Sequence, residues 1–344
     1  MADLDLKHPW IDAELHEQIW GSAPEGEIPA SLQIFGTDLA MIRKASLASW
    51  LSDDELRCDG RVEFEELTVE GYDGGPQVPV LVLRPTTPRS DRPALVYTGC
   101  GGKMMSAPRA LRGLGMLQWV VDYDIVLVSV GLRVGPEDPH PAQVHDGYAG
   151  LRWVAANSDR LGVDPRRIGL AGISGGGGVA AATALFARDH GGPDVAQLIA
   201  LTPMLDDRDI TVSNHFEGVC WPHDSNITGW TAILGEAKGG PEVDQYAAPA
   251  RALSLHGLPP TYIETGSADT FRDESLEFAL RAGLAGVPVE VHSWAGYLHG
   301  CETYAPDTEM TRALLAARLS YLRRVLGTRP GLVPNVDPRT SSAG

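Results

Sequence analysis

The sequence predicts an α/β fold in which an eight-stranded, mostly parallel sheet is flanked by helices and carries a helical cap. Three observations lead to this prediction. Apolar runs of strand length alternate with helical stretches along most of the chain, as is typical of a parallel sheet covered on both faces. A glycine-rich turn joins one of these strands to a helix. The chain has 344 residues, 43% of them hydrophobic, which is enough for one substantial domain with added elements.

Eight segments have the apolar pattern of strands. They are residues 61–69, 78–84, 94–98, 125–130, 167–173, 196–201, 261–265 and 288–293. From the third strand onward they alternate with helical stretches, most clearly residues 141–157, 176–189, 272–285 and 307–326. We expect the strands to form the centre of the domain and the helices to cover it on both faces.

Two segments fall outside the alternation and predict the cap. Residues 1–60 contain helix-like pieces with several tryptophans, and residues 205–250 form a long insertion between the sixth and seventh strands. Insertions of this length in a compact domain are usually functional lids. We therefore expect the main domain to consist of residues 61–204 and 251–327. Residues 328–344, rich in Pro, Ser and Thr, are expected to form a flexible tail.

The turn after the fifth strand has the pattern Gly-x-Ser-x-Gly, from Gly172 to Gly176. A serine held on a tight strand-to-helix turn needs glycine two positions before and after it, because a Cβ atom there would collide across the turn. The strained backbone pushes the serine hydroxyl out of the surface. Ser174 is therefore the candidate nucleophile, and a glycine-rich turn with an incidental serine is the alternative.

An acid and a base follow Ser174 along the chain. Asp269 comes just after the seventh strand, and His299 lies in a glycine-flanked loop after the eighth. Open parallel sheets place their ligand chemistry at the carboxyl ends of the strands. Histidine can take the serine proton near neutral pH, and a carboxylate fixes its tautomer. The sequence thus predicts a triad of Ser174, Asp269 and His299.

Other assignments stay open at this point. Asp273 is the alternative acid, although its expected place in the first turn of a helix favours a purely structural role. His145, His215 and His223 are alternative bases, whereas His292 lies within a strand and is expected to pack or face solvent. A zinc site is not expected, because the histidines lack the H-E-x-x-H spacing.

A second glycine loop, after the third strand, supplies candidate hydrogen-bond donors. Gly101 and Gly102 lie in it, and residues without side chains let backbone N–H groups approach a substrate closely. Acyl transfer needs such donors because negative charge develops on the former carbonyl oxygen. Gly101, Gly102 and Gly175, the residue after the nucleophile, are the expected oxyanion hole; a loop that merely needs positive φ angles is the alternative.

Further sequence blocks resemble a known family. Together with the two glycine turns, the blocks resemble the hormone-sensitive-lipase-like branch of α/β-hydrolase fold esterases, bacterial family IV, from about residue 62 to residue 326. The blocks are residues 95–97, 130–142, 150–155, 161–168 and 257–263. The resemblance implies an α/β-hydrolase fold, the triad and oxyanion hole given above, and ester hydrolysis without any cofactor.

The chain departs from the family pattern around the expected site. Gly99 and Cys100 stand where the family usually has His-Gly, and Ile173 replaces the acid that usually precedes the serine. These changes affect the oxyanion loop and the acyl pocket, so we expect activity on an atypical substrate. Phe216, Trp221 and Trp230 lie in the insertion and are candidate pocket walls, with packing inside the cap as the alternative. The candidate substrate-binding residues are Cys100, Ile173, Phe216, Trp221 and Trp230.

Charge and composition limit the partners. The chain has 45 acidic and 28 basic side chains and a net charge of −17, which argues against nucleic acid or an anionic membrane surface. No signal-like segment opens the chain and no apolar run approaches ~20 residues, so a cytoplasmic location is expected. The four scattered cysteines suit a reducing compartment. A homodimer is compatible with an exposed last strand and final helix.

We therefore expect a serine hydrolase that cleaves carboxylic ester or lactone bonds of a small molecule through an acyl-enzyme intermediate. One alternative is a specialised acyl chemistry on the same scaffold, such as that of an amidase, lyase or transferase. The other is a ligand-binding protein like the plant gibberellin receptors, which resemble this family but lose the histidine. The presence of His299 argues against the second alternative.

Overall fold

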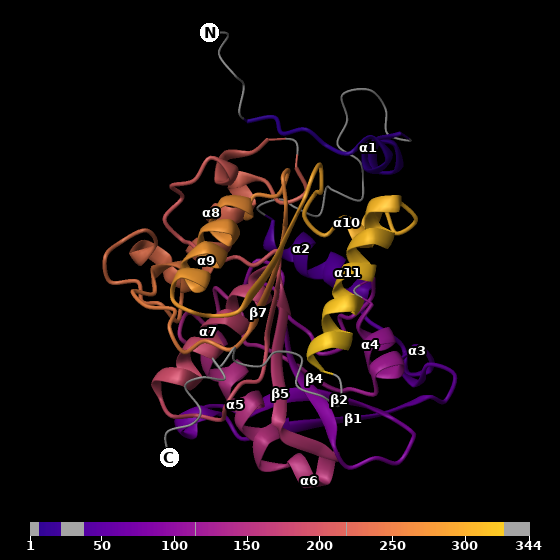
Figure 1. Ribbon diagram of the computed structural model, residues 1–344. Helices are drawn as coiled ribbons and strands as arrows, with labels where there is room; N and C mark the ends of the chain where they lie inside the picture. Colours follow the sequence, from indigo (N-terminus) through magenta and orange to yellow (C-terminus); the bar gives the residue numbers. More distant parts are fainter. Residues whose placement is uncertain (1–6, 22–37, 114, 218, 327–344) are drawn as a thin grey trace, which may run out of the picture.

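A computed structural model describes residues 7–21, 38–113, 115–217 and 219–326 and has the predicted α/β architecture (Figure 1). Eight strands form one sheet in the order β1-β2-β4-β3-β5-β6-β7-β8. Six neighbouring strands, from β4 to β8 in this order, run parallel, whereas β1 and β2 pair antiparallel. The strands are β1 (Val62–Val69), β2 (Val78–Pro85), β3 (Arg92–Gly99), β4 (Val126–Val130), β5 (Val163–Ile173), β6 (Leu198–Leu201), β7 (Thr261–Gly266) and β8 (Val289–Trp294). All eight correspond to the strands expected from the sequence.

Helices cover the sheet on both faces, as the alternation of elements predicts (Figure 1). The α-helices are α1 (Ala13–Trp20), α2 (Leu39–Ser46), α3 (Asp53–Arg57), α4 (Met116–Tyr123), α5 (Ala142–Ala156), α6 (Ser158–Leu161), α7 (Gly175–Asp189), α8 (His223–Leu234), α9 (Arg272–Leu284), α10 (Cys301–Tyr304) and α11 (Glu309–Val325). The four expected helices correspond to α5, α7, α9 and α11. No helix among the described residues is long and apolar enough to cross a membrane.

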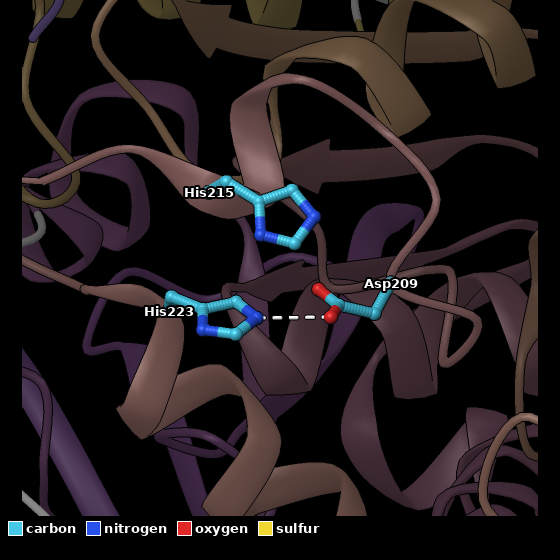
Figure 2. Close-up of side chains that lie close together, drawn as sticks. All are labelled: Asp209, His215 and His223. Carbon is cyan, nitrogen blue, oxygen red and sulfur yellow. Dashed lines mark hydrogen bonds and ion pairs between the residues drawn. The ribbon is translucent and has the colours of Figure 1, made fainter. Parts of the chain in front are cut away.

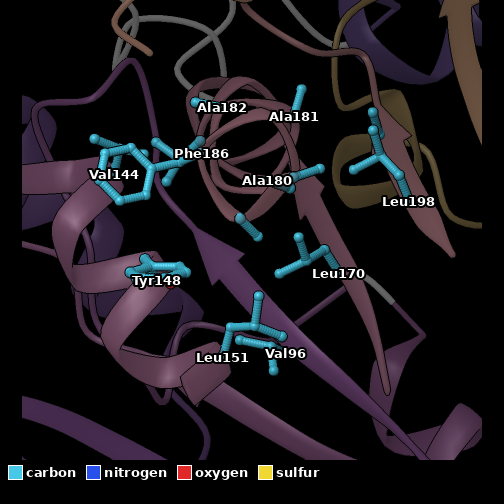
Figure 3. Packing of buried hydrophobic residues seen from close by; sticks show 14 of the residues in the cluster. Val96, Val144, Tyr148, Leu151, Leu170, Ala180, Ala181, Ala182, Phe186 and Leu198 are labelled. Carbon is cyan, nitrogen blue, oxygen red and sulfur yellow. The ribbon is translucent and has the colours of Figure 1, made fainter. Parts of the chain in front are cut away.

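Two apolar cores lie on opposite faces of the sheet. Side chains alternate along β3, so Val96 enters one core and Leu95 the other. The Val96 core contains residues of α5 and α7, such as Leu151 and Ala181 (Figure 3). The Leu95 core contains residues of α4 and α11. Both faces of the central strands are therefore buried, which explains why their sequences are continuous apolar runs.

Strand register brings distant loops together at the carboxyl edge of the sheet. Gly99 at the end of β3 pairs with Ile173 at the end of β5, so the glycine loop and the serine turn begin side by side. Gly266 of β7 pairs with Trp294 of β8, so the loops after these two strands are also neighbours. This edge carries every member of the expected triad.

The segments outside the alternation pack near the same edge. Helix α1 begins at its N-cap Asp12, whose backbone N–H donates to the Gly296 carbonyl in the loop after β8. Leu15 and Ile19 of α1 share an apolar cluster with Phe216 of the insertion. Residues 1–6, 22–37 and the expected flexible tail lie outside the described residues.

Candidate active site

Ser174 lies on the turn between β5 and α7, with φ 59° and ψ −129°. Its left-handed φ is unusual for a residue other than glycine and marks a strained turn. The flanking glycines are required by close contacts. A Cβ atom at Gly172 would lie 2.2 Å from the Gly176 carbonyl oxygen, and one at Gly176 would lie 1.7 Å from the Thr98 carbonyl oxygen. The glycine spacing thus has the steric cause inferred from the sequence.

Ser174, His299 and Asp269 form one continuous chain of hydrogen-bond contacts. His299 Nε2 lies 3.0 Å from Ser174 Oγ, and His299 Nδ1 lies 3.1 Å from Asp269 Oδ2. The other carboxylate oxygen of Asp269 accepts the backbone N–H of Phe271 at 2.9 Å. Asp269 is fully buried, while Ser174 and His299 are 8% and 6% exposed. The arrangement has the contacts of a nucleophile, a base and a carboxylate that orients the base.

The alternative acid and bases have other partners. Asp273 pairs with Arg272 and accepts the backbone N–H of Ser213. His145 packs against the rings of Tyr72 and Phe186. These contacts hold each residue in a structural role away from Ser174.

The remaining histidines also lie in contacts of their own. The ring of His292, on β8, packs against Tyr262 of the neighbouring strand β7 and against Trp294 of its own strand. His215 and His223 face each other and, with Asp209, are the only group of three potential metal ligands among the described residues. None of these three belongs to the Ser174 chain of contacts.

The glycine loop approaches the serine turn closely but offers fewer free donors than expected. A Cβ atom at Gly175 would lie 3.1 Å from the Gly102 backbone nitrogen, so the two glycines are near neighbours. The backbone N–H of Gly101, in contrast, donates to the Met105 carbonyl at 2.9 Å. The Gly101 N–H, predicted as an oxyanion donor, is therefore used within the loop. Gly102 and Gly175 remain as the two candidate donors.

Hydrogen bonds also fix the shape of the glycine loop around Gly99 and Cys100, the two residues that depart from the family pattern. The Gly101 carbonyl accepts the N–H groups of Met104 and Met105. The Cys100 carbonyl accepts the N–H of Gly176 at 2.9 Å, which ties the loop to α7. The Ser106 hydroxyl donates to the Gly99 carbonyl at 2.8 Å.

Lys103, which sequence reasoning missed, is buried directly beside the glycine loop. Its ammonium donates to the Ala247 carbonyl at 2.8 Å and lies 4.1 Å from the centre of the Trp230 ring. Burial lowers the pKa of Lys103 to about 8. The only signal in the sequence is a lysine at the end of a glycine run, which also fits an exposed turn. Its position links the loop to the insertion.

The five predicted substrate-binding residues do not all reach the site. Trp221 does: its ring centre lies 6.4 Å from that of His299, and its edge packs so closely on Gly102 that a Cβ there would lie 2.3 Å away. Trp230 lies instead beneath Lys103. Phe216 packs with the α1 cluster and under the Arg272 guanidinium.

Cys100 and Ile173 contribute mainly to the core. Cys100 is buried in the Val96 core, and burial raises the pKa of its thiol to about 12. Ile173 is half-buried and packs on the opposite core. Phe271, not predicted, meets the His299 ring edge-on with centres 5.2 Å apart. Trp221 and Phe271 are thus aromatic neighbours of His299.

Comparisons with known proteins agree with this architecture. A sequence model of the alpha/beta hydrolase fold family matches residues 95–303. Carboxylesterase NlhH from Mycobacterium tuberculosis is 32% identical over 293 residues, which span 83% of this chain and 89% of the relative. Esterase LipI from the same organism is 34% identical over 267 residues, covering 74% of this chain and 81% of the relative.

Solved esterase structures share the whole architecture. A bacterial heroin esterase matches with a TM-score of 0.82 and 33% identity over 92% of this chain and 98% of its own. A hyperthermophilic esterase from the archaeon Pyrobaculum calidifontis matches with a TM-score of 0.75 and 27% identity over 92% of this chain and 98% of its own. This chain therefore belongs to the alpha/beta hydrolase fold family, in its hormone-sensitive-lipase-like branch, and is an enzyme of the carboxylesterase type.

Proposed function

We propose that this enzyme hydrolyses carboxylic ester or lactone bonds of a small substrate through an acyl-enzyme on Ser174. The observation that carries the proposal is the unbroken chain of contacts from Ser174 Oγ through His299 to Asp269. In the first step Ser174 Oγ attacks the carbonyl carbon while His299 Nε2 takes its proton. His299 then gives that proton to the leaving alcohol. In the second step His299 activates a water molecule, which releases the acid and restores Ser174.

The oxyanion of each tetrahedral intermediate is assigned to the N–H groups of Gly102 and Gly175. The Gly175 N–H opens α7, where the first backbone donors have no partner within the helix and the helix dipole favours negative charge. The buried triad excludes bulk water, which strengthens these hydrogen bonds during the reaction.

The N-terminal segment and the insertion are assigned to the cap. Leu15 and Phe216 pack together in one apolar cluster with Leu298, the residue before His299. Trp221 from the insertion lies over both Gly102 and His299. We therefore assign Trp221 of the insertion to a wall of the substrate site. A cytoplasmic location stays a prediction from the sequence.

A homodimer is proposed through the open edge of the sheet. The strand order ends at β8, where Val291 is 45% exposed. On the neighbouring helix α9, Leu276, Leu280 and Leu284 are exposed and recur every four residues, so they share one face. We assign the contact to this face and β8 and not to α11, among whose described residues no large hydrophobic side chain is exposed.

Steady-state hydrolysis of a panel of short p-nitrophenyl esters, lactones and anilides tests the proposed activity. The wild-type enzyme is expected to cleave the esters or lactones, and Ser174→Ala to lose several orders of magnitude in kcat. Turnover of the anilides alone would point to amidase chemistry. Equal rates for wild type and Ser174→Ala would contradict the proposal.

A further inference from the structure

Asp209, His215 and His223 gather in the insertion, outside the chain of contacts around Ser174 (Figure 2). Their potential ligand atoms all lie within 4.8 Å of one another, and His223 Nε2 is 2.9 Å from Asp209 Oδ2. The ring centres of the two histidines are 4.7 Å apart. Figure 2 shows the Asp209 carboxylate facing both imidazole rings.

We propose that these three side chains bind one divalent transition-metal ion, with Zn²⁺ as the best-suited ion. Two imidazoles and a carboxylate are a common ligand set for Zn²⁺, with further positions left for water. Zn–N and Zn–O bonds of about 2.0–2.1 Å at tetrahedral angles place ligand atoms roughly 3.3 Å apart. Ligand atoms that now lie up to 4.8 Å apart would therefore approach one another by up to about 1.5 Å, which side-chain rotations can provide.

The hydrogen bonding of Asp209 also supports a bound cation. Its Oδ1 atom is buried and has no hydrogen-bond partner among the described residues, although buried carboxylate oxygens are normally satisfied. The backbone of Asp209 also has a left-handed φ of 56°, a conformation that is uncommon for residues other than glycine. A metal ion between the carboxylate and the rings would satisfy this oxygen.

Two of the three ligands, His215 and His223, come from anchored backbone. His215 ends a short 3-10 helix, η3 (Ser213–His215), whose Ser213 hydroxyl donates to the Thr270 carbonyl and whose Asn214 amide donates to Glu274. His223 is the first residue of α8. Positions held this way lose little entropy when an ion binds.

Access and charge also suit a cation. A cavity of about 340 Å³ opens beside the two histidines, and its lining includes the carboxylates of Glu217 and Asp224. Lys7 also lines it but is paired with Glu217 at 3.0 Å. The net charge of −17 favours cation binding over the whole molecule. The histidine spacing predicted no zinc site, because these ligands are separated by turns and are not placed on one helix.

A bound ion would join three points of the insertion next to Trp221, which is two residues before His223. We therefore assign the ion a structural role: it would hold the part of the insertion that carries Trp221 over His299. It would take no part in breaking the ester bond. This inference does not depend on the proposed reaction, and Ser174→Ala is expected to bind the ion as wild type does.

The test is titration of untagged, chelator-treated full-length protein with Co²⁺, followed by visible absorption, and with Zn²⁺, followed by calorimetry. One ion per chain is expected. His215→Ala, His223→Ala and Asp209→Asn should each weaken binding by at least about tenfold. His256→Ala, a histidine outside the group, should not change it. Asn suits the left-handed backbone at position 209, so this variant keeps the fold.

A second measurement separates ligand loss from misfolding. Zn²⁺ should raise the Tm of wild type and of His256→Ala but not that of His223→Ala. No saturable binding to wild type would show only an Asp209–His223 ion pair and overturn the proposal. Binding that survives all three substitutions would place the ion elsewhere and overturn it equally.

Discussion

At the scale of single residues, the site depends on one glycine that has both a special backbone and a tight neighbour. Gly102 has φ +53°, and a Cβ atom there would lie 2.3 Å from the Trp221 ring. The same residue is assigned one of the two oxyanion donors. Because residue 102 has no side chain, the Trp221 ring can pack directly against the backbone whose N–H is the assigned donor.

Gly102→Ala should lower kcat by roughly tenfold to a thousandfold, because the new methyl group displaces either Trp221 or the donor N–H. Ester hydrolysis under saturating substrate measures the effect. Gly60→Ala is the matched control, since Gly60 also has a left-handed φ of +79° but has no atom within 4 Å of the added Cβ. Equal losses in the two variants would mean that backbone strain, and not the site, causes the effect.

Lys103 gives a pH dependence whose sign follows from its lowered pKa. Between about pH 8 and 10.5, the folded protein has released the Lys103 proton while the unfolded chain still holds it, so stability rises with pH in this window. Lys103→Met removes the titration. From pH 7 to pH 9.5 the free energy of unfolding of wild type should therefore gain about 2 kcal/mol relative to the variant.

Urea unfolding of both proteins at the two pH values measures this difference. Because all other titrating groups are shared, the comparison isolates position 103. A constant difference between wild type and Lys103→Met would show that the buried ammonium keeps its ordinary pKa.

At the scale of elements, a buried ionic network connects α11 to β7, the strand before Asp269, and to α10, the helix after His299. Arg318 of α11 contacts Glu264 of β7 at 2.5 Å and Glu302 of α10 at 2.7 Å. Tyr297, two residues before His299, donates to Glu302 at 3.0 Å. The three charged side chains of this network are essentially fully buried. The helix thus supports the base through charged contacts as well as packing.

Arg318→Met should lower the free energy of unfolding by about 3–5 kcal/mol, because it leaves two buried carboxylates without their cation. Arg324→Met on the same helix is the control, since its half-exposed pair with Glu290 contributes less than about 1 kcal/mol. Chemical denaturation of both variants provides the measurement. Similar losses at positions 318 and 324 would contradict the assigned role of the network.

The elements themselves were predictable because their signals are local. The apolar runs of β3 to β8 and the helices between them are visible within windows of a few residues. Asp269 and His299 were also predictable as candidates, because each follows directly after a strand whose end lies at the ligand-binding edge.

Contacts between distant segments were not predictable in the same way. Lys103 donates to the Ala247 carbonyl across 144 positions of sequence and also lies over the Trp230 ring. The bond from the Gly101 N–H to the Met105 carbonyl was not predictable either, because it depends on how the loop folds back on itself. The sequence shows that a residue is apolar or small, but it does not show which distant segment its side chain or backbone will contact.

At the scale of the whole molecule, α9 presents an exposed apolar face beside the edge strand β8, which predicts a dimer. Wild-type protein at tens of micromolar should run as a dimer in size-exclusion chromatography with light scattering. Leu280→Glu should shift it to monomer, because a charge would be buried at the contact. Leu47→Glu, a similarly exposed leucine on another element, should leave the dimer intact. A monomeric wild type, or a dimer insensitive to Leu280→Glu, would contradict this assembly.

The proposed reaction requires that Ser174 becomes acylated with the help of His299 and Asp269. Its most direct test is rapid-mixing hydrolysis of p-nitrophenyl acetate, combined with the intact mass of the quenched protein. We predict a p-nitrophenol burst approaching one per chain in the wild type and in the surface control Ser293→Ala, with the acyl group on Ser174, and no burst in Ser174→Ala. Steady turnover with no acylated protein, or an acyl group on another residue in wild type, would contradict the proposed role of Ser174.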